Sequence, residues 1–456
     1  MTAWDACRRL AVLPHLVFLD SARESALGRY SYVAADPFAW IWPPSGLVNN
    51  VPIVLPPASP FDYLADGLER FQAATLPGLP PFQGGAAGLF AYDLCHYLER
   101  LPRPRYYDFA VPDLAVGLYD WVVSFDLREN RAWLISTGFP EIDPRRRRLR
   151  ANERRDQVRR LLDSEQSTVV AGAEVLRSPG TTANTSAPTS DLTGASEYLS
   201  PGHVRGQVLG HVKIGAPNFP VPGHAVLRSN FDRAGYIEAV RRAIDYIHAG
   251  DCFQVNIAQR LLYPAREPAL AVYERLRQCN PAPFAGYFDL GDYAIASASP
   301  ERFLKVQDGA VETRPIKGTS PRGVFPEEDL ARAEQLVSSA KDRAENVMIV
   351  DLLRNDLGRV CEYGSVRVEA LCRLESFRHV HHLVSEVRGR LRPGLGPIDL
   401  LRAAFPGGSV TGAPKIRAME IIAELEQTAR GAYCGSLGFV GFDGTMDTSL
   451  LIRTFT

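Results

Sequence analysis

The hydrophobic pattern divides the chain into stretches of different character. Residues 1–140 carry short apolar runs separated by breaks such as Pro80-Pro81, which predicts short strands joined by turns. Residues 165–228 are rich in Ser, Thr, Gly, Pro and Ala and show little periodicity, as is typical of a linker. We therefore predict three units: an N-terminal region 1–164, a low-complexity linker 165–228 and a second folded region 229–456.

The second folded region alternates helical and strand patterns. Apolar residues recur at helical spacing from Tyr236 to Ile247, and Gly250 follows as a stop signal. Residues 253–258 then alternate apolar and mostly polar side chains, which predicts a strand. Long amphipathic patterns over 325–355 and 414–426 predict two further helices.

A hairpin signal brings an acid and a lysine near one another. Asp308-Gly309, flanked by alternating residues, predicts a two-residue turn. Counting outward from this turn makes Lys317 a diagonal neighbour of Glu301, at about 5–8 Å. Strict alternation puts the two on opposite faces, but Pro315 cannot donate to the ladder, and a bulge or break there would turn Lys317 toward Glu301. The spacing alone fits a surface ion pair equally well.

Two carboxylates form a candidate metal site. Asp342 and Glu345 stand three residues apart in the predicted helix 325–355, so both can face one point. Few carboxylates and many waters suit Mg²⁺ better than Ca²⁺ or Zn²⁺, and no cluster of Cys and His offers a site for a softer metal. The alternative is a pair of acids on the wet face of a helix.

Further candidates lie nearer the C-terminus. The glycine-rich segment 407–415 leads into a helix start at Pro414, where free backbone N–H groups favour a carboxylate ligand. His382 stands in an apolar string, where most histidines are satisfied core residues. Arg453 stands in an apolar strand and needs an anionic partner, either structural or a ligand.

Composition argues against several classes of partner. With 46% hydrophobic and 23% charged residues and a net charge of −1, the chain has no global field to attract nucleic acid or a membrane. No apolar run approaches the ~18 residues that span a bilayer. The arginines between 145 and 160 lack interleaved aromatic residues, so we predict a solvated helix face there. Seven dispersed cysteines predict buried, reduced thiols in a cytoplasmic protein.

Taken together, these motifs resemble the chorismate-utilising enzymes, which include anthranilate, aminodeoxychorismate, isochorismate and salicylate synthases. The resemblance is dense over 229–456 and extends to Arg29-Tyr30-Ser31, Asp36-Pro37 and the segment from Phe82 to Asp93. It implies an α+β fold of the anthranilate synthase component I type. Such a fold has two large, mainly antiparallel sheets packed face to face with helices outside, and a core shared by both folded regions.

Lys317 distinguishes between members of this family. The motif Pro-Ile-Lys-Gly-Thr at 315–319 is similar to aminodeoxychorismate synthases, whereas anthranilate synthases carry alanine at that position. The resemblance implies that Lys317 is a covalent nucleophile toward C2 of chorismate, Glu301 the general acid and base, and His382 a further catalytic residue. The implied activity is amination of chorismate to 4-amino-4-deoxychorismate, for para-aminobenzoate and folate biosynthesis.

The resemblance also implies binding residues. Glu345, with Asp342 nearby, would bind Mg²⁺. Substrate contacts fall on Gly318, Thr319, Ser409, Tyr433 and Arg453. A bound tryptophan, as in the N-terminal region of relatives, would contact Ser21, Leu27, Gly28, Arg29, Tyr30, Pro283, Phe284 and Ala285.

A partner and a further segment are implied as well. No Cys/His module for glutamine hydrolysis is evident, so ammonia would come from a separate glutamine amidotransferase subunit. Relatives continue past Thr456 with a glycine loop and a helix bearing two more metal-site glutamates, so we expect the 456 residues alone to keep most of the fold but little activity. Two alternatives stay open: another member such as anthranilate synthase component I, or a catalytically silent subunit that still docks the amidotransferase.

Overall fold

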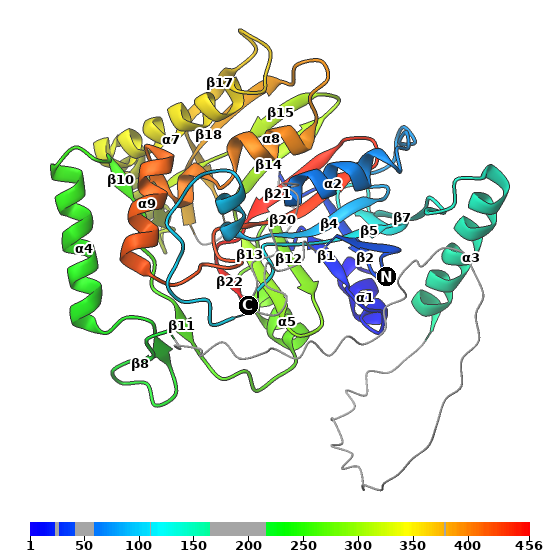
Figure 1. The fold of residues 1–456 in the computed structure, drawn as a ribbon, viewed down its shortest axis with the longest axis horizontal. Helices are drawn as coiled ribbons and strands as arrows, with labels where there is room; N and C mark the ends of the chain where they lie inside the picture. Colours follow the sequence, from blue (N-terminus) through cyan, green and yellow to red (C-terminus); the bar gives the residue numbers. More distant parts are fainter. Residues whose placement is uncertain (23–26, 42–58, 110, 165–215, 378–379) are drawn as a thin grey trace, which may run out of the picture.

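A computed structural model describes residues 1–22, 27–41, 59–109, 111–164, 216–377 and 380–456 (Figure 1). Two large sheets form its centre, and their strand pairs are antiparallel. The seven-stranded sheet runs in the order β22 (Thr454–Phe455), β13 (Ala294–Ser299), β12 (Phe284–Asp289), β1 (Val17–Asp20), β2 (Tyr30–Ala34), β6 (Trp121–Asp126), β7 (Arg131–Ser136). The ten-stranded sheet runs β16 (Ile316–Pro321), β18 (Val380–Arg390), β15 (Ala310–Thr313), β14 (Arg302–Gln307), β21 (Met446–Leu450), β20 (Ser436–Gly441), β4 (Gly85–Phe90), β5 (Leu114–Tyr119), β3 (Ala39–Ile41), with β17 (Arg367–Ser376) also paired to β18.

The two sheets pack face to face through an apolar layer. Tyr32 of β2 lies edge-on to Phe439 of β20, with ring centroids 5.5 Å apart, and Phe288 of β12 belongs to the same buried cluster. Strands from before residue 165 and after residue 215 contribute to both sheets. One core therefore serves both folded regions, because burial of the facing surfaces requires strands from each.

Helices cover the two outer faces, so the layers run helix, sheet, sheet, helix (Figure 1). The outer face of the ten-stranded sheet packs against α2 (Pro60–Glu69), α7 (Ala340–Gly358), α8 (Pro397–Ala404) and α9 (Lys415–Glu426). The outer face of the seven-stranded sheet packs against α1 (Ala3–Leu10), α3 (Pro144–Asp163) and α5 (Ala269–Cys279). The predicted fold class is confirmed.

Smaller elements complete the described structure. The helix α4 (Arg233–His248) packs against α9, and α6 (Pro326–Ser338) precedes α7. Short elements are η1 (Tyr92–Tyr97), η2 (Gly408–Val410), β8 (Phe219–Pro220), β9 (Arg228–Ser229), β10 (Gln254–Val255), β11 (Leu261–Leu262) and β19 (Gly412–Ala413). None of the described helices is long and apolar enough to cross a membrane.

Several local predictions need correction. The helix predicted over 325–355 is two helices, because Ser339 adopts an extended conformation and caps α7 by accepting the Asp342 N–H. The strand predicted over 253–258 is reduced to β10, which pairs only with the short β19. Cys279 is exposed, whereas the other six cysteines are buried thiols as predicted. The predicted linker lies outside the described residues up to position 215.

The predicted hairpin is confirmed. Gln307 pairs with Ala310, and Asp308 and Gly309 both have positive φ, at 50° and 72°, as a type I′ turn requires. The chain leaves β15 at Arg314 and Pro315 and then continues as β16, which pairs with β18. The strand is thus interrupted at the predicted place, and this interruption positions the candidate site.

Candidate active site

Three of the predicted residues meet at Ser409. The Lys317 Nζ donates a hydrogen bond to the Ser409 carbonyl oxygen at 2.9 Å. The Ser409 hydroxyl donates to Oε1 of Glu301 at 2.7 Å. The candidate nucleophile and the candidate acid therefore lie on either side of one residue from η2, although 92 residues separate Ser409 from Lys317 in sequence.

A bulge at Gly318 shapes the lysine strand. The β16–β18 register shifts between Lys317 and Thr319, and Gly318 has a φ of +81°. A Cβ at this position would lie 3.0 Å from the Asp342 Cβ, so both the backbone conformation and the close approach of α7 favour glycine. The second irregularity was not predicted, because only the proline signal is visible in the sequence.

Glu301 is a buried acid whose proton exchanges near neutrality. Burial raises its pKa to about 7. The Ser409 hydroxyl, the Lys317 charge, the Ile316 backbone N–H and the Arg453 charge all act in the opposite direction by favouring the carboxylate. A carboxyl group with this pKa can both donate and accept a proton at physiological pH.

His382 lies beside this group in a neutral state. Its Nδ1 is 2.8 Å from the Thr319 hydroxyl oxygen, and the side chain is buried in β18. Burial, and to a smaller extent the Arg453 charge, lower the His382 pKa to about 4. The adjacent His381 instead bonds to Asp329 at 2.9 Å and to Ser376, which is a structural arrangement. Of the two histidines, only His382 contacts a predicted substrate residue.

Arg453 differs from the expectation of an arginine inside an apolar strand. It is exposed in the link between β21 and β22 and has a φ of 54°. It forms no salt bridge with a carboxylate of the described residues. Its charge nevertheless acts on Glu301 and His382, so it lies near both and has its guanidinium available for an anionic ligand.

A cleft of about 480 Å³ opens beside Ser409. Its walls come from the α4 face at Val240 and Ile244, from Asn256, and from Tyr433, whose side chain is 44% exposed. A cleft of this size is within the range of small-molecule sites. Ser409 and Tyr433, two of the predicted substrate-binding residues, thus line the same cleft.

Asp342 and Glu345 can serve as part of a Mg²⁺ site. Both are half-buried on α7, and Asp342 packs against Gly318, beside Lys317. Glu345 has only a loose ion pair with the exposed Lys341, at 3.9 Å. No group of three or more His, Cys, Asp or Glu suited to a metal occurs among the described residues. Two carboxylates fit Mg²⁺ held jointly with waters and a substrate carboxylate.

Two residues that hold Ser409 in place were not predicted. The Asn256 amide donates to the Ser409 carbonyl at 3.3 Å, and the Arg430 guanidinium donates to the neighbouring Val410 carbonyl at 3.1 Å. Arg430 also forms a buried ion pair with Glu426 at 2.7 Å. The i, i+4 spacing of Glu426 and Arg430 is visible in the sequence, but their burial is not.

A second, larger cleft of about 780 Å³ lies between the two sheets. Seven of the eight residues predicted to contact tryptophan line it; Gly28 does not. Ser21 is buried there, and its hydroxyl donates to the Tyr30 and Pro283 carbonyls at 2.8 and 3.3 Å. Segments 262 residues apart therefore form one wall, and the far end of the cleft is lined by charged residues of the ten-stranded sheet.

Comparison with known proteins places this geometry in a family. A model described as "chorismate binding enzyme" matches residues 203–456. The aminodeoxychorismate synthase component 1 of Klebsiella aerogenes is 42% identical over 376 residues, which is 82% of this chain and 69% of that protein. The anthranilate synthase component 1 of Thermus thermophilus is also 42% identical, over 83% of this chain and 70% of that protein.

A solved structure shares the fold. The crystal structure of anthranilate synthase component I from Streptococcus pneumoniae superposes with a TM-score of 0.69 at 29% identity. The match covers 95% of this chain and 85% of that one. The similarity therefore includes both sheets and the helices on their outer faces.

Proposed function

The chain belongs to the chorismate-binding enzyme family, and we propose that within it the protein aminates chorismate at C4 to give 4-amino-4-deoxychorismate. The observation that carries the proposal is Lys317, whose amine donates a hydrogen bond to the carbonyl of the cleft-lining residue Ser409 and forms no salt bridge with a described carboxylate. A lysine held by a neutral carbonyl is free to act as a nucleophile once deprotonated. The buried Glu301 on the other side of Ser409 supplies the matching acid.

The reaction proceeds in two balanced displacements. The neutral Lys317 amine forms a bond to C2 of the ring, the ring double bonds shift, and the C4–oxygen bond breaks. Glu301 gives its proton to the departing hydroxyl, which leaves as water. Ammonia then bonds to C4, the double bonds shift back, and the Lys317–C2 bond breaks with the neutral amine as leaving group. The ammonium formed at C4 returns one proton to the Glu301 carboxylate. The Glu301 pKa of about 7 suits both directions of proton transfer.

The remaining residues bind and orient the substrate. Arg453 and the backbone around Gly318 and Thr319 would hold carboxylate and hydroxyl groups, and Tyr433 would close the open side of the cleft. Asp342 and Glu345 would hold Mg²⁺, which when bound neutralises the charge of the ring carboxylate. His382, neutral at physiological pH, would position Thr319 and exchange hydrogen bonds rather than carry charge.

Two partners belong to the proposal. The name "component 1" carried by relatives indicates a two-component assembly, and we propose a glutamine amidotransferase subunit as the ammonia source. In the inter-sheet cleft, Ser21, Arg29, Tyr30 and Phe284 would contact a bound tryptophan, whose ring suits the apolar wall and whose charged groups suit the polar one.

Anthranilate synthase activity is the second candidate, favoured by the equal identity to the Thermus thermophilus protein. Product identity separates the two. The protein, expressed from its complete coding frame, is incubated with chorismate, Mg²⁺ and ammonium chloride, and the products are resolved by liquid chromatography and mass spectrometry. We expect 4-amino-4-deoxychorismate. Anthranilate would favour the second candidate, and unchanged chorismate would favour a silent subunit.

A further inference from the structure

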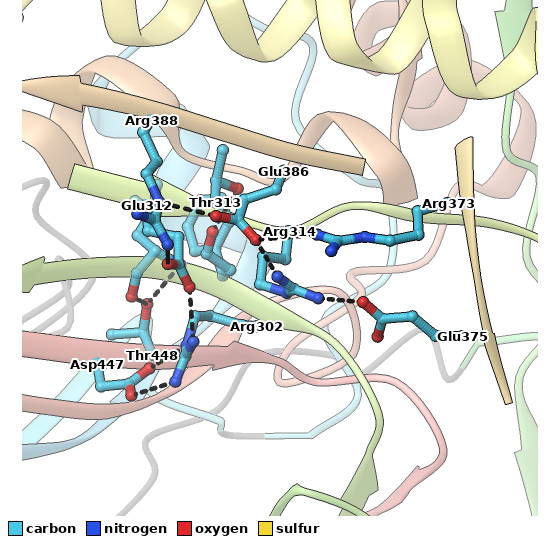
Figure 2. A network of polar contacts seen from close by, with 12 residues as sticks. Arg302, Glu312, Thr313, Arg314, Arg373, Glu375, Glu386, Arg388, Asp447 and Thr448 are labelled. Carbon is cyan, nitrogen blue, oxygen red and sulfur yellow. Dashed lines mark hydrogen bonds and ion pairs between the residues drawn. The ribbon is translucent and has the colours of Figure 1, made fainter. Parts of the chain in front are cut away.

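The hairpin that carries Glu301 and Lys317 has a second face, which is lined by paired charges. Arg302 follows Glu301 and points the other way, toward the inter-sheet cleft, where its guanidinium bonds to Asp447 at 3.0 Å and Glu312 at 2.8 Å (Figure 2). Arg302 also stacks on Phe284 of the opposite sheet, 4.8 Å from the ring centroid. Its side chain is only 8% exposed, so these contacts are made in a largely desolvated site.

Arg314 makes the corresponding contacts on the lysine side. It precedes Pro315 in the link between β15 and β16, and its guanidinium bonds to Glu386 of β18 and to Glu375 of β17 (Figure 2). Arg388 of β18 joins the two halves, because it bonds to Glu312 at 3.1 Å and to Glu386 at 2.7 Å. The network therefore crosses β21, β14, β15, β18 and β17.

The backbone leaves a gap where this network lies. The β14–β15 ladder reaches Lys305, which faces Glu312, and no described ladder pair joins β14 to β16 beyond that point. Across the gap, the Thr313 hydroxyl donates to the Phe303 carbonyl, and the Ile316 N–H reaches the Glu301 carboxylate. No described ladder pair joins β14 to β16 directly, and the two are linked only indirectly, through β15 and the common partner β18. The side-chain contacts across the gap therefore add to this indirect link.

We infer that Arg302 and Arg314 are positioning residues, which hold the Glu301 strand and the Lys317 strand at the separation that the proposed reaction requires. The inference rests on the proposed function for its kinetic consequences. Arginine suits this task because its planar guanidinium bonds two carboxylates in fixed directions, whereas a lysine at the same position has a single point charge. The network thus acts on the active site from the opposite face of the sheet without contacting substrate.

Arg314→Met tests the inference while keeping most of the side-chain volume. Arg154→Met is the matched control, because Arg154 is also 9% exposed at its side chain and also bonds two carboxylates, Asp36 at 2.7 Å and Asp120 at 3.3 Å, but lies on α3. We expect Arg314→Met to lower kcat by about 10²-fold, as for a small misplacement of reacting groups, with little change in the KM for chorismate. Arg154→Met should lower thermal stability and leave kcat unchanged.

The ionisation of Glu301 gives a readout that does not depend on turnover. Its carboxyl group is faced by Lys317 from β16, by Arg453 beyond β21 and by the Cys434 thiol before β20. If the strands separate, the Lys317 charge and the Ile316 N–H, both carried by β16, no longer favour the carboxylate, so the pKa of Glu301 rises. Infrared difference spectra, with Glu301→Gln identifying the band, should show titration near pH 7 in the parent protein and at higher pH in Arg314→Met.

The conservative variant Arg314→Lys guards against failure to fold. It should restore part of kcat and bring the Glu301 titration partly back, because one of the two ion pairs is kept. Parent-like kcat and Glu301 titration in both Arg314 variants, or equal kcat losses in Arg314→Met and Arg154→Met, would overturn the inference. Absence of chorismate turnover in the parent would count against the proposed function alone, since the infrared comparison would still decide the positioning role.

Discussion

The two faces of the chain segment from Glu301 to Lys317 differ in whether their buried charged groups form salt bridges. On the cleft face, Arg302 and Arg314 each bond two carboxylates, so their burial is compensated. On the Ser409 face, Glu301 is equally buried but is bonded to a neutral hydroxyl, and Lys317 is bonded to a neutral carbonyl. This part of the chain therefore carries salt-bridged arginines on one side and, on the other, an acid and an amine that form no direct salt bridge with described residues.

This difference helps to distinguish charged residues that stabilise the fold from those that are available for a reaction. Transfer of a charged group out of water raises its free energy. A well-placed counter-ion offsets much of this increase and makes the charged group less reactive. A buried acid without a direct salt bridge can shift its pKa instead: burial raises the pKa of Glu301 to about 7, although the nearby Lys317 and Arg453 charges act against this shift. The Ser409 face is packed like the rest of the core but differs from it in electrostatics. The free-energy cost of burying Glu301 there is consistent with a role in chemistry.

The largest effect on this comparison is expected when the amine of Lys317 is removed. We expect Lys317→Ala to abolish the covalent adduct with chorismate completely, because no other amine lies beside Glu301 and Ser409 in the described site. Some turnover can survive through direct attack of ammonia at the ring. Intact-mass spectrometry after addition of chorismate measures the adduct, and an adduct that persists in the alanine variant would exclude Lys317 as the nucleophile.

Removing the acidic group of Glu301 should have the next largest effect. Glu301→Gln keeps an oxygen that accepts the Ser409 hydroxyl but cannot donate a proton to the leaving group, so turnover should fall by about 10²–10⁴-fold. In the parent, turnover should decline as pH rises through about 7, because the acid loses its proton. That decline should vanish in the variant. A pH–rate profile with the same decline in both proteins would assign it to another group.

The third prediction concerns Glu345 on α7 and the dependence of activity on Mg²⁺. Glu345→Gln should raise the Mg²⁺ concentration needed for half-maximal activity by about 10- to 100-fold, because one of the two carboxylates offered to the ion is lost. Asp351→Asn is the control, since Asp351 lies on the same helix with its side chain 65% exposed and pairs with Arg354. Superimposable Mg²⁺ titrations for Glu345→Gln and the parent would make Glu345 an ordinary surface acid.

The smallest effect is expected at the rim of the paired network. Arg388 bonds Glu312 and Glu386, but its side chain is 55% exposed. Arg388→Met should lower the free energy of unfolding by about 1 kcal/mol or less, as for other solvent-exposed ion pairs. Urea denaturation monitored by tryptophan fluorescence measures it. A loss of about 3–5 kcal/mol, typical of breaking a buried pair, would show that Arg388 belongs to the buried centre of the network.

Local signals in the sequence were sufficient for the local elements. Asp308-Gly309 predicted the hairpin because only residues that tolerate positive φ fit a type I′ turn, and apolar spacing predicted the helix that ends before Gly250. The break of the helix 325–355 at Ser339 was missed, because the apolar period continues across it and the capping bond depends on backbone geometry. Two candidate site groups could also be named from motif and spacing, the Glu301–Lys317 pair and the Asp342–Glu345 pair.

The sequence by itself determined the hairpin, through its turn chemistry, and, through the resemblance of its motifs to a known family, the fold class and the identity of the candidate acid and amine. Only the tertiary structure decided that Glu301 and Lys317 share Ser409, that Glu301 is buried without a direct salt bridge to a described residue, and that Arg302 and Arg314 are paired behind them. The physical reason is that pairing and desolvation depend on contacts between strands far apart in the sequence, such as the 145 positions between Arg302 and Asp447. The spacing of residues in the sequence does not indicate which charged groups such contacts pair and which they leave without a salt bridge.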